Sequence, residues 1–106
     1  MAIKSRAKGK VGELELAHFL DNHGFPAARG QQFKGGPGSP DVICEALGDF
    51  HIECKRVERA DVEAWMAQAC GDAGTKTPVV MHRKNKGEWM ATLRLEDFLA
   101  MKMGLI

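Results

Sequence analysis

The sequence predicts an α/β fold in which a mixed sheet is flanked by helices, and three observations predict it. Apolar residues recur at helical spacing in residues 11–20 and again in residues 62–70. Apolar and polar residues alternate in residues 41–46 and 50–55, as in strands that bury one face. Segments rich in glycine and proline separate these elements. The predicted order of elements along the chain is therefore αβββαββα.

The composition is that of one globular domain spanning residues 1–106. Hydrophobic residues make up 44% of the chain and charged residues 27%, which argues against a disordered protein. The net charge of +1 does not by itself indicate a nucleic-acid binder, and the distribution of charge matters more than its sum. The first ten residues hold four basic side chains. They predict either a basic N-terminal arm over residues 1–10 or the start of a helix.

The expected location is the cytoplasm, in a bacterium or a phage-infected host cell. The N-terminus lacks the apolar segment of a signal peptide, and no apolar run has membrane-spanning length. The three cysteines, Cys44, Cys54 and Cys70, form no CxxC pair, so a zinc knuckle is not expected. Free thiols in a reducing compartment are the simplest interpretation.

The first half of the chain predicts one helix and three strands. The helix begins its apolar pattern at Val11 and ends at Gly24, a residue type favoured just past a helix C-terminus. The next elements are a weak strand at 25–33, a glycine- and proline-rich loop at 34–40 and a strand at 41–46. A turn at 47–49 leads to the strand 50–55, and Gly48 is expected there at positive φ.

The second half predicts two helices and two strands. Asp61 is expected to cap a helix over residues 62–70, because its side chain accepts hydrogen bonds from free backbone N–H groups. The apolar stripe of this helix includes Trp65 and Met66, for which a place in the core is favoured over a dimer interface. The remaining elements are a strand at 78–82, a basic turn at 83–87, a strand at 88–93 and a helix at 95–101.

The second and third strands predict an antiparallel hairpin that gathers polar side chains. Glu53 and Lys55 are two residues apart on one strand and therefore share a face. Burying the apolar residues of both strands in one core requires odd positions of one strand to face odd positions of the other. This register places Asp41 opposite or diagonal to Glu53 and Lys55. It requires a connection with an odd number of residues, or a bulge.

The residue types in this hairpin suit metal-assisted phosphodiester hydrolysis. Two carboxylates held close together repel each other unless a cation lies between them. Mg²⁺ binds oxygen ligands, often one or two carboxylates together with phosphate oxygens of a substrate. Such an ion polarises the phosphoryl group and acidifies a bound water, and a neighbouring lysine stabilises developing charge. A surface cluster of ion pairs is the alternative interpretation.

These residues resemble the motif of the PD-(D/E)XK nuclease superfamily. Ser39-Pro40-Asp41 matches its first element, and Glu53-Cys54-Lys55 matches its second. More closely, the chain resembles archaeal-type Holliday junction resolvases and their small phage-encoded relatives.

The first helix extends this resemblance. Gly9, Glu13 and Glu15 match the Gly-x-x-x-Glu-x-Glu pattern at the start of that helix in these resolvases, and His23-Gly24-Phe25 follows the helix as it does there. The resemblance covers residues 9–98. It implies a restriction-endonuclease-like fold with an αβββαβ core.

The resemblance also implies a role for each matching residue. Asp41 and Glu53 are expected to bind Mg²⁺ or Mn²⁺, together with the backbone carbonyl of Cys54. Lys55 is expected to position or activate the attacking water. Glu13 is expected to reach the site directly or through water, and a solvated helix position that favours the helix dipole is its equal alternative.

Further side chains are candidates for contact with DNA. Gln68 resembles a glutamine found on the helix after the hairpin in these nucleases. The basic turn is interpreted equally as a phosphate-binding element and as a solvated hairpin tip. The basic candidates are Arg83, Lys84 and Lys86 in that turn, and Lys8, Lys10 and Lys34 elsewhere. His51 shares the face of Glu53, and a hydrogen bond to a neighbour is favoured there over a catalytic role.

The expected function is metal-dependent endonuclease cleavage of DNA, in the recombination or repair of branched structures. A symmetric junction is cut on two strands, which implies a homodimer. The Ser-Pro-Asp motif and Gln68 also suit the VRR-NUC branch of the superfamily, whose members are not tied to four-way junctions in the same way. A general or flap nuclease, a DNA-binding module that no longer cuts, and a purely structural α/β protein are the alternatives.

Overall fold

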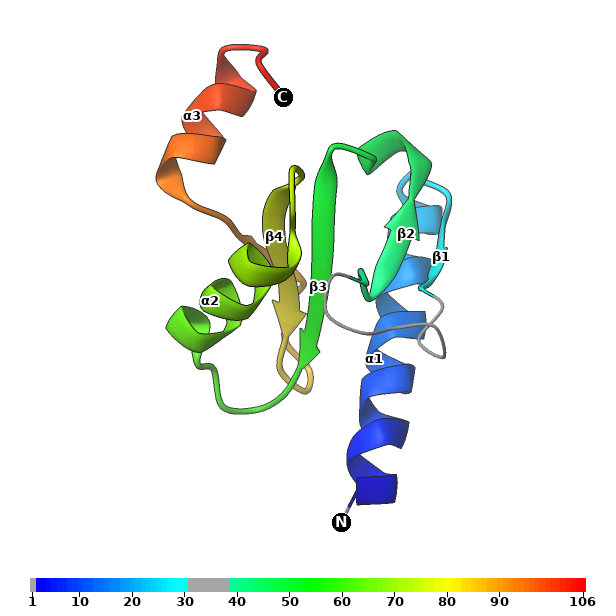
Figure 1. Ribbon diagram of the computed structural model, residues 1–106. Coiled ribbons are helices and arrows are strands. Elements are labelled where there is room, and N and C mark those ends of the chain that lie inside the picture. The colour runs from blue at the N-terminus through cyan, green and yellow to red at the C-terminus, as the bar shows by residue number, and fades with distance from the viewer. Residues whose placement is uncertain (1, 31–38) are drawn as a thin grey trace.

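The described residues form one five-stranded mixed sheet with helices on both of its faces (Figure 1). The structure is a computed structural model that describes residues 2–30 and 39–106, with side chains described from residue 9. The elements are α1 (Ala2–Asn22), β1 (Ala27–Arg29), β2 (Val42–Cys44), the 3₁₀ turn η2 (Glu45–Leu47), β3 (Phe50–Arg56), α2 (Val62–Asp72), β4 (Thr77–Arg83), β5 (Met90–Thr92) and α3 (Leu95–Lys102). The predicted order αβββαββα is confirmed.

The strands lie in the sheet in the order in which they occur in the chain, β1-β2-β3-β4-β5. Only β3 and β4 run parallel, and the other neighbouring pairs are antiparallel. Parallel neighbours need a crossover connection, which α2 provides. These two strands are also the longest, and they lie in the interior of the sheet, between the layers formed by α1 and α2.

One face of the sheet packs against α1. Leu16, Ala17 and Leu20 of this helix pack against Val42 and Ile52 in the main core cluster. Gly12 brings the helix close to β3, because a Cβ at this position would lie 2.6 Å from the Cβ of Arg56. The even-numbered residues of β3 thus face α1, as the predicted alternation requires.

The opposite face packs against α2, where Trp65 and Ala69 are buried against Val80 of β4. Asp61 caps this helix, since its Oδ1 accepts a hydrogen bond from the backbone N–H of Ala64 at 3.2 Å. Trp65 is 9% exposed, so its predicted place in the core is confirmed. This helix covers the odd-numbered residues of β3, including the predicted site residue Glu53.

The predicted hairpin register is confirmed at the one pair that joins β2 to β3, Val42 with Ile52. The connection consists of residues 45–49, an odd number as predicted, but it is two residues longer than the predicted turn at 47–49. The prediction for Gly48 is wrong, because its φ is −63°. A 3₁₀ turn reverses the chain here, and its backbone hydrogen bond from Gly48 to Glu45 needs no positive φ.

Several predicted boundaries differ from those in the structure. Residues 2–10 belong to α1, so that the N-terminal segment is a helix rather than an extended arm. The strands β1, β2 and β5 each have three residues and are shorter than predicted. The predicted loop at 34–38 and the end of the first predicted strand, residues 31–33, lie outside the described residues. Gly24 ends the first helix with φ +87°, as predicted.

The last helix, α3, stands apart from the sheet and from the other helices (Figure 1). Its apolar side chains are exposed, with Leu95 at 70%, Phe98 at 53% and Leu99 at 50%. Arg94 anchors its start by an ion pair with the buried Asp97 at 2.8 Å. None of the described helices is both long and apolar enough to cross a membrane.

Candidate active site

The structure brings the predicted site residues together around one cavity of about 490 Å³. The cavity lies beside the second half of β3 and reaches both covering helices. Its walls include Glu13 from α1, Asp41 before β2, Glu53, Cys54 and Lys55 from β3, and Gln68 from α2. Residues from four separate segments of the chain therefore meet here, as the hairpin register and the resemblance predict.

The short length of β2 creates the open edge that this cavity occupies. Beyond the Val42–Ile52 pair, Asp41 donates its backbone N–H to the Ile52 carbonyl at 3.0 Å. Its side-chain Oδ2 accepts the backbone N–H of Cys54 at 2.8 Å. The Asp41 carboxylate thus replaces the backbone carbonyl that would accept the next hydrogen bond between β2 and β3. The N–H and C=O of a strand residue point the same way, so the Cys54 carbonyl faces this edge as well.

Glu53 is buried beside this aspartate and is 2% exposed. Its pKa is raised from 4.5 to about 8, mainly because burial disfavours the charged form, and further because of the charge on Asp41. A hydrogen bond between the two carboxyl groups also raises the pKa, since one of them must carry the proton. Lys55 opposes this shift. The two carboxylates therefore repel each other when both are charged and no cation lies between them.

His51 holds the other side of the Glu53 carboxyl. Its Nε2 lies 2.8 Å from Glu53 Oε1, and both side chains are almost fully buried. Burial lowers the pKa of His51, which favours the neutral imidazole, although Asp72 opposes this effect. The predicted hydrogen bond of this histidine to a neighbour is confirmed. It fixes the Oε1 atom of Glu53.

Glu13 lies near the acidic pair but is engaged elsewhere. Its Oε1 accepts a hydrogen bond from Arg29 Nε at 2.7 Å, and only 11% of its side chain is exposed. Burial raises its pKa, Arg29 lowers it, and the charge on Asp41 raises it again. The ligand atoms of Glu13, Asp41 and Glu53 do not come within 4.8 Å of one another as a group. Water would thus connect Glu13 to an ion held by the other two.

The donor set at the cavity fits a hard divalent cation. Asp41 and Glu53 offer carboxylate oxygens, the Cys54 carbonyl adds a third oxygen, and the raised pKa of Glu53 is relieved by positive charge. His51, Glu53 and Asp72 also place ligand atoms within 4.8 Å of one another. His51 and Asp72 do not line the cavity, so this second group is the weaker candidate for an ion that meets a substrate there.

Lys55 points from β3 toward α2. Its Nζ donates a hydrogen bond to Gln68 Oε1 at 3.1 Å, which fixes the ammonium at the rim of the cavity. Gln68 is exposed, so this bond leaves both side chains accessible to a ligand. The thiol of Cys54, by contrast, faces α1, and burial raises its pKa to about 12. Only the backbone of this cysteine is available to the site.

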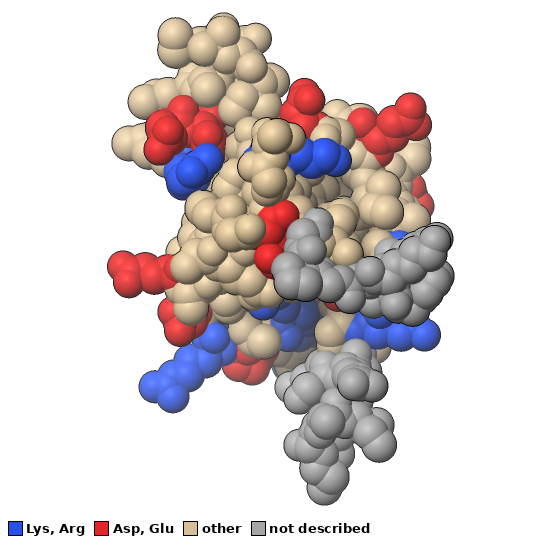
Figure 2. Space-filling view, in the orientation of Figure 1, with Lys and Arg blue, Asp and Glu red and all other residues tan. Residues whose placement is uncertain are grey.

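The remaining candidates for DNA contact are dispersed. Lys84 and Lys86 are exposed on the turn between β4 and β5, Arg83 is half-buried, and Lys10 is exposed on α1. The side chain of Lys8 and the whole of Lys34 lie outside the described residues. Figure 2 shows acidic and basic side chains interspersed over one face of the molecule, in keeping with the small net charge.

Three polar neighbours of the site were not predicted from the sequence. Arg29 binds Glu13, Asp72 lies beside His51, and Arg56 donates from Nε to Glu15 at 3.1 Å. Arg56 is an even-numbered residue of β3, so the strand alternation could have predicted that it faces α1. The other two contacts join segments far apart in the chain, and no local pattern indicates them.

Comparisons of the chain with protein-family models, with curated proteins and with solved structures give no match. The geometry of the cavity and the sequence motif are therefore the basis for a functional assignment.

Proposed function

We propose that this protein is a metal-dependent endonuclease that hydrolyses DNA phosphodiester bonds with Mg²⁺ or Mn²⁺. The observation that carries the proposal is the convergence of Asp41, Glu53, Lys55 and Glu13 on one cavity. A pure binding module has no need of two acids that repel each other in a buried position. Catalysis of phosphoryl transfer, in contrast, uses such a pair to hold a cation.

Different residues of the chain would perform the separate tasks of this reaction. Asp41, Glu53 and the Cys54 carbonyl would hold the cation, which supplies Lewis-acid polarisation of the phosphate and an acidified water. The Lys55 ammonium lies at the rim and would orient the attacking water or stabilise charge on the phosphate. Gln68 positions Lys55 through their hydrogen bond. Glu13 would bind a water at the edge of the cation site.

The element order and strand directions support the finer fold assignment that the resemblance implies. The segment from α1 to β4 has the order αβββαβ, with an antiparallel β1-β2-β3 meander and a parallel β3–β4 pair joined by α2. We infer a restriction-endonuclease-like core on this basis. The β4–β5 hairpin and α3 follow that core.

The proposed substrate is a branched DNA such as a Holliday junction, cut by a homodimer. The exposed apolar side chains of α3 support the homodimer, because an apolar helix face that is open to solvent is a typical site of protein association. Sedimentation of the purified protein over a range of concentrations measures this state. The VRR-NUC alternative, a general or flap nuclease, uses the same chemistry.

A pair of lysine variants tests the catalytic proposal. Lys55→Ala should reduce Mg²⁺-dependent cleavage of labelled DNA at least a hundredfold, because it removes the charge at the rim, while the circular dichroism spectrum stays unchanged. Lys76→Ala makes the same substitution at an exposed lysine before β4, outside this cavity, and should cut normally. Full activity of Lys55→Ala would refute the assignment. DNA binding without cleavage by the unsubstituted protein would favour the silent binding module.

The substrate class is tested with four-way, flap, nicked and linear DNA of matched sequence. Symmetric cuts and a preference for the four-way junction are expected of a resolvase. Equal cutting of all four would favour the general nuclease.

A further inference from the structure

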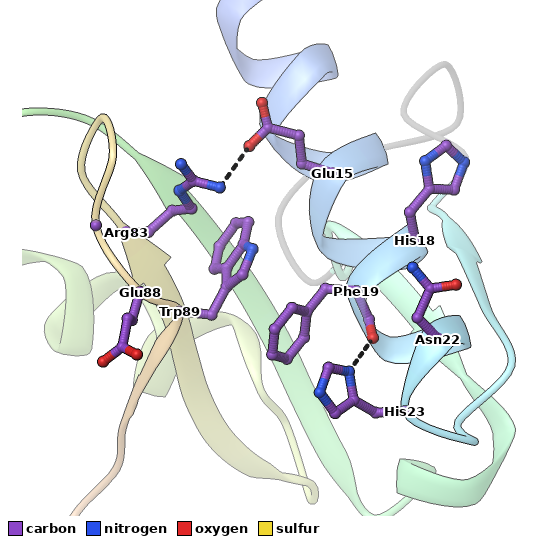
Figure 3. Close-up of a pocket in the computed structure, with 9 residues that line it drawn as sticks. Glu15, His18, Phe19, Asn22, His23, Arg83, Glu88 and Trp89 are labelled. Carbon is purple, nitrogen blue, oxygen red and sulfur yellow. Dashed lines mark hydrogen bonds and ion pairs between the residues drawn. The ribbon is translucent and has the colours of Figure 1, made fainter.

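A second cavity, of about 710 Å³, lies between α1 and the turn that joins β4 to β5 (Figure 3). The α1 side contributes Phe19, Asn22 and His23, and the turn side contributes Arg83 and Trp89. None of these side chains belongs to the candidate active site. Among these residues, only Arg83 is predicted from the sequence to contact DNA.

Aromatic rings form the walls of this cavity. Phe19 and Trp89 point toward each other from the two sides, with ring centroids 6.3 Å apart and a tilt of 52° (Figure 3). His23 stacks on Phe19 at 4.1 Å, and its Nδ1 is tied to the Phe19 carbonyl at 2.7 Å. Phe19 is 37% exposed and His23 is exposed, so ring surface is open to a ligand. Flat rings of this kind favour stacking by another planar group.

Charged side chains join this aromatic cavity to the candidate active site. Glu15 binds Arg56 at 3.1 Å and Arg83 at 3.5 Å. Arg56 lines the active-site cavity, whereas Glu15 and Arg83 line the aromatic one. Arg56 and Arg83 are also partners in the β3–β4 register. The two cavities are thus separated by a single cluster that holds two guanidinium groups and one carboxylate.

This cluster suits a phosphate between the two cavities. Arginine is the side chain best matched to phosphate oxygens, because its planar donors bind them in pairs. Glu15 balances one of the two guanidinium charges, so the three-residue cluster itself has a net positive charge, while Glu88 adds a carboxylate elsewhere on the wall of the aromatic cavity. Arg83 also lies over the Trp89 ring, with its Cζ 5.8 Å from the ring centroid. A cation beside an aromatic wall is typical of sites that bind single-stranded nucleic acid.

We propose that the aromatic cavity binds one unpaired nucleobase of the DNA strand whose backbone passes through the candidate active site. The base stacks on the Trp89–Phe19 wall, and the adjoining phosphate contacts Arg56 and Arg83. The inference rests on the proposed function in taking DNA as the ligand. It extends that function, because a base can enter this cavity only where the strand is unpaired. Such strands occur at the branches of junctions and flaps.

The stacking is tested by the fluorescence of Trp89 in a protein that does not cut. Trp65→Phe leaves Trp89 as the only tryptophan, and Asp41→Asn with a chelator prevents cleavage. A short oligothymidylate should quench this fluorescence, whereas an oligomer of the same length with abasic sugars should not. Equal responses to the two oligomers, or no response to either, would overturn the inference. Equal quenching by an apolar peptide would replace the nucleobase with a protein ligand.

Binding measurements on side-chain variants give a second readout. Phe19→Ala and Trp89→Ala should each weaken the affinity for oligothymidylate about tenfold and that for the abasic oligomer less than twofold, because one stack is lost. Phe25→Ala removes a ring that is 40% exposed and lines neither cavity, and it should change neither affinity. The ratio of the two affinities is measured within each variant, so altered stability cannot imitate the effect.

Failure of this inference is distinguishable from failure of the proposed function. Cleavage by the unsubstituted protein with no base preference in any variant would refute the subsite alone. Quenching by bases in a protein that cuts no DNA would support the subsite and refute the catalytic assignment.

Discussion

Replacing Asp41 with asparagine should stabilise the metal-free protein at alkaline pH while it removes the cation site. Asparagine keeps an oxygen that accepts the Cys54 N–H, so the edge of β3 retains its hydrogen bond. The charge that raises the pKa of Glu53 is lost. We therefore expect that Asp41, a proposed catalytic residue, lowers the stability of the metal-free fold.

The magnitude follows from the pKa of Glu53. Below pH 4.5 this carboxyl is protonated in both the folded and the unfolded chain, and it costs nothing. As the pH rises from 4.5 to about 8 the unfolded chain releases the proton first, so the free energy of unfolding falls. The full cost is on the order of 5 kcal/mol, since a tenfold change in acidity corresponds to about 1.4 kcal/mol. Burial of Glu53 causes most of this cost, and the charge on Asp41 causes about 1–2 kcal/mol of it.

Thermal unfolding with a chelator measures this difference. The melting temperature of Asp41→Asn relative to the unsubstituted protein should increase by about 5–10 °C between pH 5 and pH 9. Asp49→Asn removes the same charge at an exposed position after the η2 turn and should show no such increase. Parallel pH profiles for Asp41→Asn and the unsubstituted protein would refute the repulsion between the two acids.

Two further predictions concern the cation and the packing of α1. Binding of Mg²⁺ at pH 7 should release a proton from the acidic pair, because Glu53 has a pKa of about 8. The calorimetric heat of Mg²⁺ binding should then differ between buffers of different ionisation enthalpy. Identical heats in these buffers would contradict the shared proton. Gly12→Ala should lower the free energy of unfolding by about 1–3 kcal/mol, because the new Cβ would lie 2.6 Å from the Cβ of Arg56. Gly71→Ala on α2 is the matched control: its new Cβ has no neighbour within 4 Å, so it should raise the free energy of unfolding by about 0.5–1 kcal/mol. Equal effects of the two glycine substitutions in denaturant unfolding would contradict the close approach of α1 to β3.

Local patterns predicted the hairpin because strand alternation is a local property. The apolar residues of β2 and β3 can share a core in only one register, and that register brings Asp41 to Glu53 whatever lies above them. The same reasoning failed at Gly48. A glycine in a turn allows a positive φ but does not require it, and a 3₁₀ turn of odd length satisfies the register equally well.

The order of the elements, the hairpin register and the grouping of Asp41, Glu53 and Lys55 could thus be predicted from local sequence patterns. Each of these depends on the spacing of residues within one or two neighbouring segments. The burial of Glu53 under α2, which raises its pKa to about 8, follows instead from how distant segments pack. The same packing brings Arg29 to Glu13, and it brings Arg56 and Arg83 to Glu15 between two cavities. Alternation fixes the face on which a side chain lies, whereas the chemistry of that face depends on distant segments that fold over it.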